Sequence, residues 1–244
     1  MIAAIRYVLS MFFCTIWHAS RVILAAARGE RQQPGGIYDR IPTEYCRDLL
    51  RINRITTRAV GLSHLDGLGP VVFVADHKSW FDVPALVDVL PGSLRFVAKK
   101  ELGRVPLFGQ ALRAAGHIEV DRHDPASAHL AYEKAARAIK GGLSAVVFGE
   151  GTRSRDGRLH QLKKGPFVLA IAAQVPVVPV HVEGSGRVLP KGSIRPHPGL
   201  ITVHVGAPIP TAGLTYDDRD ALALRTREAL VGLGAHPSSD RTAL

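Results

Sequence analysis

A histidine and an aspartate follow an apolar run in the stretch "VVFVADHKSWFDVP" at residues 71–84. On one continuous helix, His77 and Asp82 would point about 140° apart, because each residue turns roughly 100°. They meet if residues 76–81 form a turn and Asp82 begins the next helix, whose first turn tolerates Pro84. The Asp82 carboxylate would then fix the tautomer of His77 and leave its other ring nitrogen free as a base for a hydroxyl group. The alternative is that Asp82 only caps a helix and His77 only belongs to the turn.

Two other chemistries that use histidine are not favoured by the sequence. Ser79 lies in the same stretch, but no GxSxG pattern surrounds it. We therefore interpret Ser79 as a turn-stabilising hydroxyl and not as the nucleophile of a Ser–His–Asp triad. No HExxH motif is present and the remaining histidines are scattered, so we predict no metal site.

A second cluster of chemistry-bearing residues lies at "FGEGTRSRDG" (148–157). Glycines there let the backbone approach a ligand closely, and an arginine can grip a phosphate group with two hydrogen bonds. "LKKGPF" (162–167) places lysines at the start of a helix, where the N–H groups also favour an anion. The alternative is a solvated basic loop with a local ion pair. Gly151, Thr152 and Arg153, together with Arg122 and Lys164, predict a phosphate pocket, and Glu150 lies among these cations.

Alternating strand and helix patterns must position these residues. Strands are expected at 71–75, 94–98, 117–120, 144–148, 177–182 and 201–205, and helices at 83–90, 106–115, 125–140, 165–174 and 216–231. The near-continuous apolar strands indicate an α/β fold with a mostly parallel mixed sheet covered by helices. The last strand is expected to be antiparallel edge structure. In such sheets ligands bind beyond the carboxyl ends of the strands, which is where the two clusters lie.

The chain is predicted to comprise three parts. Residues 1–60 are expected to hold membrane-associating helices and a linker, including a loop at 31–42 and a helix at 43–61 that begins at Thr43. Residues 61–233 are expected to form the α/β domain, and residues 234–244 a loose tail.

The first thirty residues are apolar but contain Arg6 and Arg21. These charges bracket too short an apolar run for a simple membrane-spanning helix, which needs about 20 apolar residues. We expect an uncleaved helix that lies in or dips into the membrane interface, with arginines at the headgroups. A signal peptide and a helix packed on the domain's own core are the alternatives.

The charge balance indicates an anionic partner. Lys plus Arg is 31 against 21 Asp plus Glu, which gives a formal net charge of +10. Nucleic acid is not favoured, because basic residues are not interleaved with aromatics and no zinc-finger or RNP pattern is present. An acidic membrane surface or a phosphorylated substrate remains. The two cysteines form no CxxC motif, which favours a reducing compartment.

Four ordered blocks resemble the glycerophospholipid acyltransferase family typified by 1-acyl-glycerol-3-phosphate acyltransferases. "DHKSWFD" (76–82) is similar to the family's NHxSxxD, and "FGEGTRS" (148–154) is similar to FPEGTRS. "GHIEVDR" (116–122) and "VPVVPV" (175–180) resemble the second and fourth blocks. The resemblance covers about residues 60–210. Three positions depart from the usual pattern, namely Asp76 for Asn, Gly149 for Pro and Glu119 for an apolar or aromatic residue.

The resemblance implies a direct transfer. His77, held by Asp82, would deprotonate a glycerol-type hydroxyl that attacks an acyl-CoA or acyl-carrier protein thioester, without an acyl-enzyme and without a cofactor. Arg122, Arg153 and Lys164 would hold the acceptor's phosphate, with Glu150, Gly151 and Thr152 shaping the pocket. Val175, Pro176 and Pro179 would line or support the acyl side.

The family's N-terminal helices imply a monotopic or peripheral protein on the cytoplasmic face of the inner membrane. The expected partners are a membrane lipid surface, a lysophospholipid acceptor and an acyl thioester donor. The default acceptor is lysophosphatidic acid, and another lyso-lipid such as lyso-ornithine lipid is an alternative. A non-catalytic lipid-binding protein and a phosphate-ester hydrolase are the competing functions.

Overall fold

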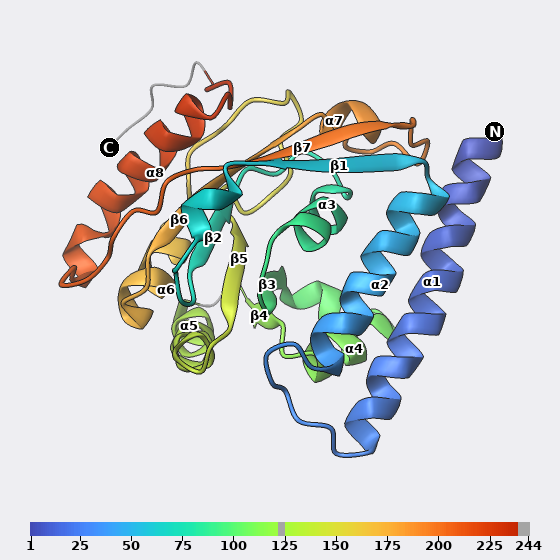
Figure 1. Ribbon diagram of the computed structural model, residues 1–244, viewed down its shortest axis with the longest axis horizontal. Coiled ribbons are helices and arrows are strands. Elements are labelled where there is room, and N and C mark those ends of the chain that lie inside the picture. Colours follow the sequence, from blue (N-terminus) through green and yellow to red (C-terminus); the bar gives the residue numbers. More distant parts are fainter. Residues whose placement is uncertain (122–124, 239–244) are drawn as a thin grey trace.

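A computed structural model describes residues 1–121 and 125–238 of the chain. Seven strands form one sheet in the order β1-β7-β6-β2-β5-β3-β4 (Figure 1). All neighbouring strands run parallel except β6 and β7, which are antiparallel. The strands are β1 (Ile55–Val60), β2 (Val72–Ala75), β3 (Leu94–Lys99), β4 (Ile118–Val120), β5 (Ser144–Phe148), β6 (Val177–Glu183) and β7 (Gly199–Val205).

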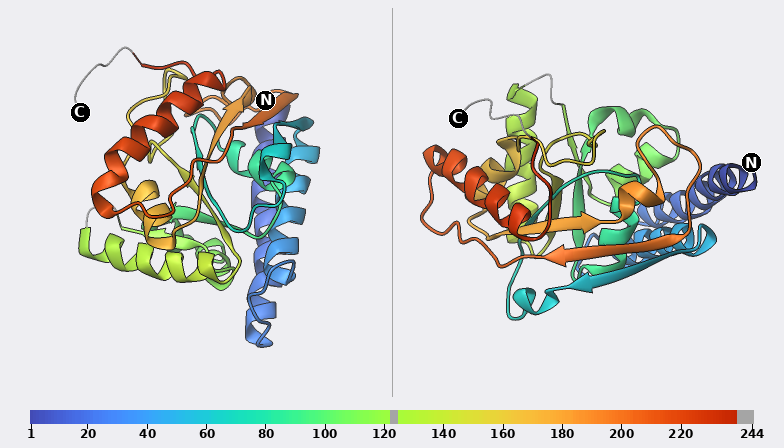
Figure 2. Two further views of the ribbon diagram at one scale, coloured as in Figure 1. Left: turned by 60° about the vertical axis from the view of Figure 1, so that its left-hand side comes forward. Right: turned by 90° about the horizontal axis from the view of Figure 1, so that it is seen from above.

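Helices cover both faces of this sheet, which confirms the predicted α/β class (Figure 2). One face packs on α2 (Ile37–Ile52) and α3 (Asp82–Val89), with α1 (Ile2–Ala27) and α4 (Phe108–Ala114) beside them. The other face packs on α5 (Pro125–Lys140), α6 (Gly165–Ala173) and α8 (Arg219–Gly232). Short helical turns complete the described chain: η1 (Leu62–Leu65), η2 (Lys100–Arg104), α7 (Ser185–Val188) and η3 (Tyr216–Asp218).

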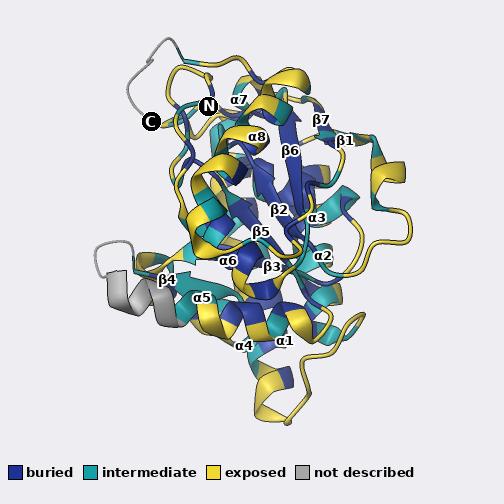
Figure 3. Ribbon diagram, turned by 90° about the vertical axis from the view of Figure 1, so that its left-hand side faces the viewer, coloured by how far each residue is buried: buried dark blue, intermediate teal, exposed yellow. Residues whose placement is uncertain are grey.

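Alternation along the central strands builds the two cores. Phe73 and Ala75 of β2 face the α2–α3 side, whereas Val72 and Val74 face the α6–α8 side. All four are buried, so the strand reads as a continuous apolar run instead of an alternating one. Figure 3 shows the same pattern, with buried strands at the centre and exposed positions on the outer helices. The catalytic candidates follow these rigid central strands directly.

The helix predicted over 43–61 is confirmed for residues 43–52 and wrong for residues 55–60, which form β1. α2 begins earlier, at Ile37, and ends at Ile52, after which Arg54 adopts a positive φ of 58° and the chain enters β1. The β-branched residues of "ITTRAV" favour an extended strand, and the parallel ladder with β7 satisfies their backbone. The predicted cap Thr43 lies inside α2, where its hydroxyl donates to the Asp39 carbonyl at 2.8 Å. The predicted loop over 31–42 is therefore shorter than expected.

The two C-terminal expectations also differ from the structure. β7 is antiparallel to β6, as expected, but it is not an edge strand because β1 pairs with its other side. Residues 235–238, expected to be part of a loose tail, pack against the domain. Ala235 is buried, the His236 carbonyl accepts the Leu159 N–H at 2.7 Å, and the Ser238 N–H returns to the Leu159 carbonyl at 3.0 Å.

α1 is a long apolar helix with one buried and one exposed side. Its inner side contacts α2 and α4, and the two helices α1 and α2 lie side by side (Figure 1). His18 of α1 pairs with Asp48 of α2 at 3.0 Å, and Arg21 pairs with Glu44 at 2.5 Å. By length and composition α1 could cross a membrane. Only 28% of its most apolar window is buried in the protein, whereas a core helix would be mostly buried. Its outer side exposes Phe12, Phe13 and Trp17.

Candidate active site

The turn between β2 and α3 brings His77 and Asp82 together. β2 ends at Ala75 and α3 begins at Asp82, so the pair spans the turn that the spacing requires. His77 Nδ1 lies 2.7 Å from Asp82 Oδ2. The same oxygen accepts the backbone N–H groups of Lys78 at 2.7 Å and Ser79 at 2.8 Å. Asp82 thus both closes the turn and orients the imidazole of His77. The alternative that Asp82 only caps the helix does not hold, because the N-cap residue of α3 is Phe81.

The surroundings of the pair fix the ring of His77. The Asp82 side chain is fully buried, whereas that of His77 is 14% exposed. Phe148, at the end of β5, stacks on the His77 ring with centroids 3.7 Å apart. Because Nδ1 is held by Asp82, Nε2 is the nitrogen left for a substrate. Sequence analysis missed the role of Phe148, although strand alternation from the buried Val146 would have placed it on this face.

Ser79 is a turn residue, as its context predicts. Its hydroxyl donates to the Leu189 carbonyl at 2.9 Å and accepts the Phe81 N–H at 3.2 Å. The side chain is fully buried. Ser79 therefore ties the β2–α3 turn to the end of α7, and its buried hydroxyl is engaged in these two bonds.

An apolar cavity of about 380 Å³ is lined by His77 and by residues of α1. Residues of α1, α2, α3, β3 and α4 line it together with His77 and Phe148. Gly151, Thr152 and Arg153 also line this cavity, and the Arg153 guanidinium lies 4.6 Å from the ring centroid of Trp80. A cation over an indole ring is held in place by the ring's negative face. We call Gly151, Thr152 and Arg153 the polar rim of this cavity, because the rest of its lining is mostly apolar.

Glu150 is buried next to this rim. Burial, followed by the nearby Asp76 carboxylate, raises the pKa of Glu150 to about 8. Its Oε1 has no hydrogen-bond partner among the described residues. A carboxyl in this state is protonated near neutral pH and offers a proton instead of a charge. The adjacent Gly151 has a φ of +76°, a conformation that side chains disfavour.

The buried Glu150 predicts a pH dependence of stability. A carboxyl whose pKa is raised on folding contributes fully below its unfolded value of 4.5, and that contribution is lost as the pH rises through about 8. We expect Glu150→Gln to remove this loss, on the order of 2 kcal/mol after discounting for partial hydration. Urea unfolding at pH 5 and pH 8.5 measures it. The free energy of unfolding of the variant should increase relative to that of the wild type between pH 5 and pH 8.5. A difference between the two proteins that does not change with pH would contradict the raised pKa of Glu150.

The predicted phosphate-binding and acyl-side residues do not all lie here. Lys164 precedes α6 and pairs with Asp220 of α8 at 3.0 Å, away from the lining of the apolar cavity. Val175 packs against the core on the α6–α8 side, and none of Val175, Pro176 and Pro179 lines that cavity. Arg122 lies outside the described residues. The structure thus places Gly151, Thr152 and Arg153 in the same cavity lining as His77, with Glu150 buried next to them in the chain. Lys164, Val175, Pro176 and Pro179 do not line that cavity.

The three departures from the family pattern have physical explanations. The Asp76 carboxylate is fully buried and bonds His181 Nδ1 and Lys78 Nζ, each at 2.8 Å. Although burial favours its neutral form, these partners hold the pKa of Asp76 below its ordinary value. A Cβ at Gly149 would lie 2.8 Å from a Leu162 methyl group, so a larger residue requires Leu162 to shift. Glu119 forms an ion pair with Arg113 at 3.2 Å.

Comparison with known proteins places this geometry in a family. The model of the family described as Acyltransferase matches residues 56–183, just over half of the chain. The chain belongs to the Acyltransferase family. The matched segment contains both the His77–Asp82 turn and the 148–154 loop.

Curated relatives agree with this membership. The chain is 33% identical over 205 residues to 1-acyl-sn-glycerol-3-phosphate acyltransferase of Cocos nucifera, covering 83% of this chain and 65% of that one. It is 35% identical over 181 residues to 1-acyl-sn-glycerol-3-phosphate acyltransferase alpha of Homo sapiens, covering 74% and 64%. The chain therefore spans less than two thirds of either relative.

The fold resembles that of the 1-acyl-sn-glycerophosphate acyltransferase PlsC from Thermotoga maritima. The TM-score is 0.78 at 21% identity, over 95% of this chain and 93% of that one. At this identity the likeness establishes the fold. The aligned fold includes almost the whole chain, and so both the mostly parallel sheet and most of the N-terminal helix region.

Proposed function

We propose that the protein transfers a fatty acyl group from an acyl thioester to the free hydroxyl of 1-acyl-glycerol-3-phosphate. The observation that carries this proposal is the hydrogen bond between the fully buried Asp82 carboxylate and His77, which lines an apolar cavity. A base beside an apolar chamber suits the chemistry of a lipid hydroxyl and a fatty chain. The names of the curated relatives support the choice of acceptor.

In the proposed reaction His77 Nε2 takes the proton of the acceptor hydroxyl as its oxygen attacks the thioester carbonyl carbon. A carbon–oxygen bond forms, the carbon–sulfur bond breaks, and the thiolate leaves with the proton that His77 has accepted. The Asp82 carboxylate stabilises the imidazolium that forms in between. No enzyme nucleophile is required, which fits the buried, hydrogen-bonded Ser79.

The polar rim is the proposed contact for the acceptor. Arg153, held over Trp80, offers its guanidinium beside His77. Its planar fork suits a phosphate group, and Thr152 adds a hydroxyl donor on the same loop. Arg122 stays in the proposal as a predicted partner from the second block. Lys164, paired with Asp220, is the least favoured of the predicted phosphate contacts.

The N-terminal helix is the proposed membrane contact. Its exposed Phe12, Phe13 and Trp17 lie on the helix whose inner side lines the apolar cavity. Lipid can therefore reach the cavity from the side where α1 would lie in the interface. The two free cysteines fit the reducing, cytoplasmic face of the membrane.

Substitution of the exposed aromatics tests this contact. We expect Phe12→Ser, Phe13→Ser and Trp17→Ser together to weaken binding to anionic vesicles at least tenfold, since three large side chains leave the interface. Co-sedimentation with phosphatidylglycerol-containing vesicles measures it. The matched control replaces three exposed apolar residues elsewhere, Ile194, Leu200 and Leu224, by Ser. Equal loss in both sets would argue against α1 as the membrane contact.

Acceptor-dependent thiol release tests the function itself. The wild-type protein is offered acyl-CoA or acyl-carrier protein with lysophosphatidic acid, lysophosphatidylcholine or lyso-ornithine lipid. Release that requires lysophosphatidic acid supports the proposal, and release that requires another acceptor reassigns the substrate. Release without any acceptor would indicate a thioesterase. No release from folded protein in lipid would favour a non-catalytic lipid-binding protein.

A further inference from the structure

A second buried carboxylate lies at the other end of the turn that carries His77. Asp76 directly follows β2, and its side chain is fully buried. Its Oδ1 accepts the backbone N–H of Val182 at 2.8 Å, and its Oδ2 lies 2.8 Å from His181 Nδ1. Both partners belong to β6, the strand that pairs with β2 in the sheet. Asp76 therefore fastens the first residue of the turn to a central strand.

Lys78 connects Asp76 to the bonds already described at Asp82. Its ammonium group lies 2.8 Å from Asp76 Oδ2, and its backbone N–H donates to Asp82 Oδ2 at 2.7 Å. Asp82 Oδ2 is also the atom that holds His77 Nδ1. His77 thus lies in the chain between two residues, Asp76 and Lys78, whose side chains are bonded to each other. Buried carboxylates therefore fix the residues on both sides of the base.

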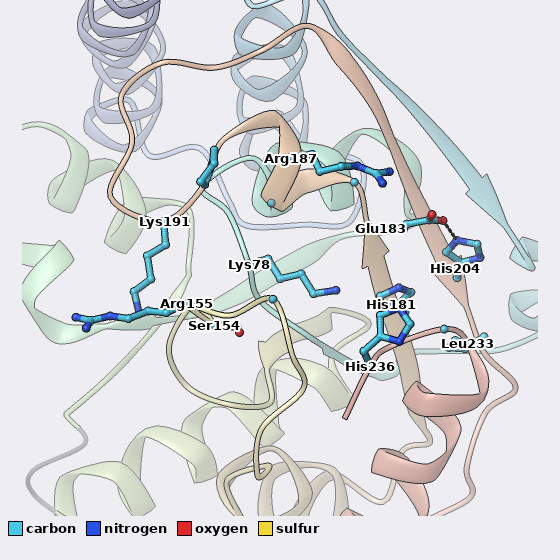
Figure 4. Close-up of a pocket in the computed structure, with 15 residues that line it drawn as sticks. Lys78, Ser154, Arg155, His181, Glu183, Arg187, Lys191, His204, Leu233 and His236 are labelled. Atoms are coloured by element: carbon cyan, nitrogen blue, oxygen red, sulfur yellow. Dashed lines mark hydrogen bonds and ion pairs between the residues drawn. The ribbon is translucent and has the colours of Figure 1, made fainter. Parts of the chain in front are cut away.

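The contacts of Asp76 lie away from the apolar cavity. Lys78 and His181 line a second cavity, of about 600 Å³, which His77 does not line. Figure 4 shows the Lys78 side chain extending toward His181 there. Asp76 itself lines neither cavity, so it can act only through its neighbours and not by contact with a substrate. We call the second cavity the cationic cavity, because its lining also includes Arg155, Arg187 and Lys191.

The contacts of Asp76 require a carboxylate. The Val182 N–H and the Lys78 ammonium group only donate hydrogen bonds, so both need an acceptor. Burial alone would raise the pKa of Asp76, but the His181 bond and the Lys78 charge lower it below its ordinary value. An asparagine, the residue usual in the family, would offer one acceptor oxygen and no charge. It would leave the Lys78 ammonium, whose side chain is only 15% exposed, without the carboxylate that it pairs with.

We propose that Asp76 is a positioning residue for His77. Its bonds to His181, Lys78 and the β6 backbone hold the base where the reaction needs it, and a displacement of about 1 Å can cost on the order of 10²-fold in rate. This inference rests on the proposed acyl transfer and adds residues of β6 to the groups that support it. It also gives the fourth block a role. "VPVVPV" (175–180) does not line the apolar cavity but leads directly into the two β6 residues that bond Asp76.

The ring N–H of His77 reports the geometry of the base without any turnover. In protein with isotope-labelled histidine, the Nδ1–H groups bonded to Asp82 and Asp76 should give two protected downfield proton signals in NMR spectra. His77→Gln and His181→Gln assign them by removing one signal each. We expect Asp76→Asn to shift the His77 signal by more than its linewidth or to broaden it. A His77 signal that stays unchanged in folded Asp76→Asn would overturn the inference.

Kinetics separate this positioning role from a merely structural one. We expect Asp76→Asn to lower the kcat of acceptor-dependent thiol release about 10–10²-fold, while both KM values stay within about twofold, since the cavity walls are unchanged. Lys78→Gln keeps the backbone N–H that Asp82 holds, so it serves if Asp76→Asn does not fold. It should lower kcat about threefold or more and move the His77 signal in the same direction. An unchanged kcat and signal in Lys78→Gln would then overturn the inference.

Asp39→Asn is the matched control. Asp39 also forms a largely buried pair, with Arg95 Nη1 at 2.6 Å, and neither residue lines either cavity. Breaking this pair should lower the urea midpoint as Asp76→Asn does, yet leave kcat and the His77 signal unchanged. A loss of kcat of equal size in both variants would reflect general stability and overturn the inference. A His77 signal that moves in Asp76→Asn, in a protein without transferase activity, would keep the positioning contacts and reject the proposed reaction.

Discussion

His77→Ala is expected to lower acceptor-dependent thiol release by about 10²–10⁴-fold, the usual contribution of a positioned general base. The loss should fall on kcat, because the substrates still contact the cavity walls, the rim and Arg153. The measurement is the steady-state rate with saturating acyl thioester and lysophosphatidic acid in vesicles. Near-UV and far-UV circular dichroism would establish that the variant is folded.

The control for this variant is His197→Ala. His197 is exposed, and its backbone N–H donates to the Val188 carbonyl at 2.8 Å. The control should therefore retain full activity. A His77→Ala protein that keeps more than about a tenth of the wild-type kcat would reject His77 as the base. Acceptor-independent release that survives in it would indicate a separate hydrolytic route.

The central strands could be predicted well because the sequence of each strand is itself apolar and β-branched. β2 and β5 are uninterrupted apolar runs that end at polar turns, and β5 occupies the expected residues 144–148. α5 likewise matches its expected bounds, 125–140, with Pro125 at its start. Such local signals do not depend on which partner strand lies alongside.

The errors arose where tertiary contacts override local propensity. α2 contains Pro42, which reads as a loop residue, yet Tyr38, Ile41 and Leu49 are buried and give the helix its inner side. The residues of β1 fall within the helix expected over 43–61, but they form a strand because they pair with β7, more than a hundred residues away. A single sequence does not reveal such a distant pairing.

The candidate site was predictable in part for a similar reason. His77, Asp82, Glu150, Gly151 and Arg153 follow adjacent strands and converge at their carboxyl ends. Lys164 follows no such strand end, and its partner Asp220 lies on α8. The cationic cavity was missed because Arg187 and Lys191 come after β6, in a segment without a recognisable motif. Its charge is visible only when the loops are assembled.

Asp82→Asn is expected to lower kcat by about 10²-fold or more while the KM values change little. An amide has no charge to stabilise the imidazolium of His77, and it no longer selects the tautomer that leaves Nε2 free. It also accepts the Lys78 and Ser79 N–H groups less strongly, so the turn should lose about 1–3 kcal/mol of stability. Urea unfolding with steady-state kinetics measures both effects. The control is Asp66→Asn, at an exposed residue outside both cavities.

The double variant His77→Ala, Asp82→Asn decides whether the two residues act as one unit. If Asp82 works only through His77, the kcat of the double variant should equal that of His77→Ala, because an aspartate without its histidine has nothing left to orient. Losses that multiply would instead mean that the Asp82 carboxylate supports the reaction through the turn itself. The N–H groups of Lys78 and Ser79 would then be the route, since Asp82 Oδ2 holds them and His77 together.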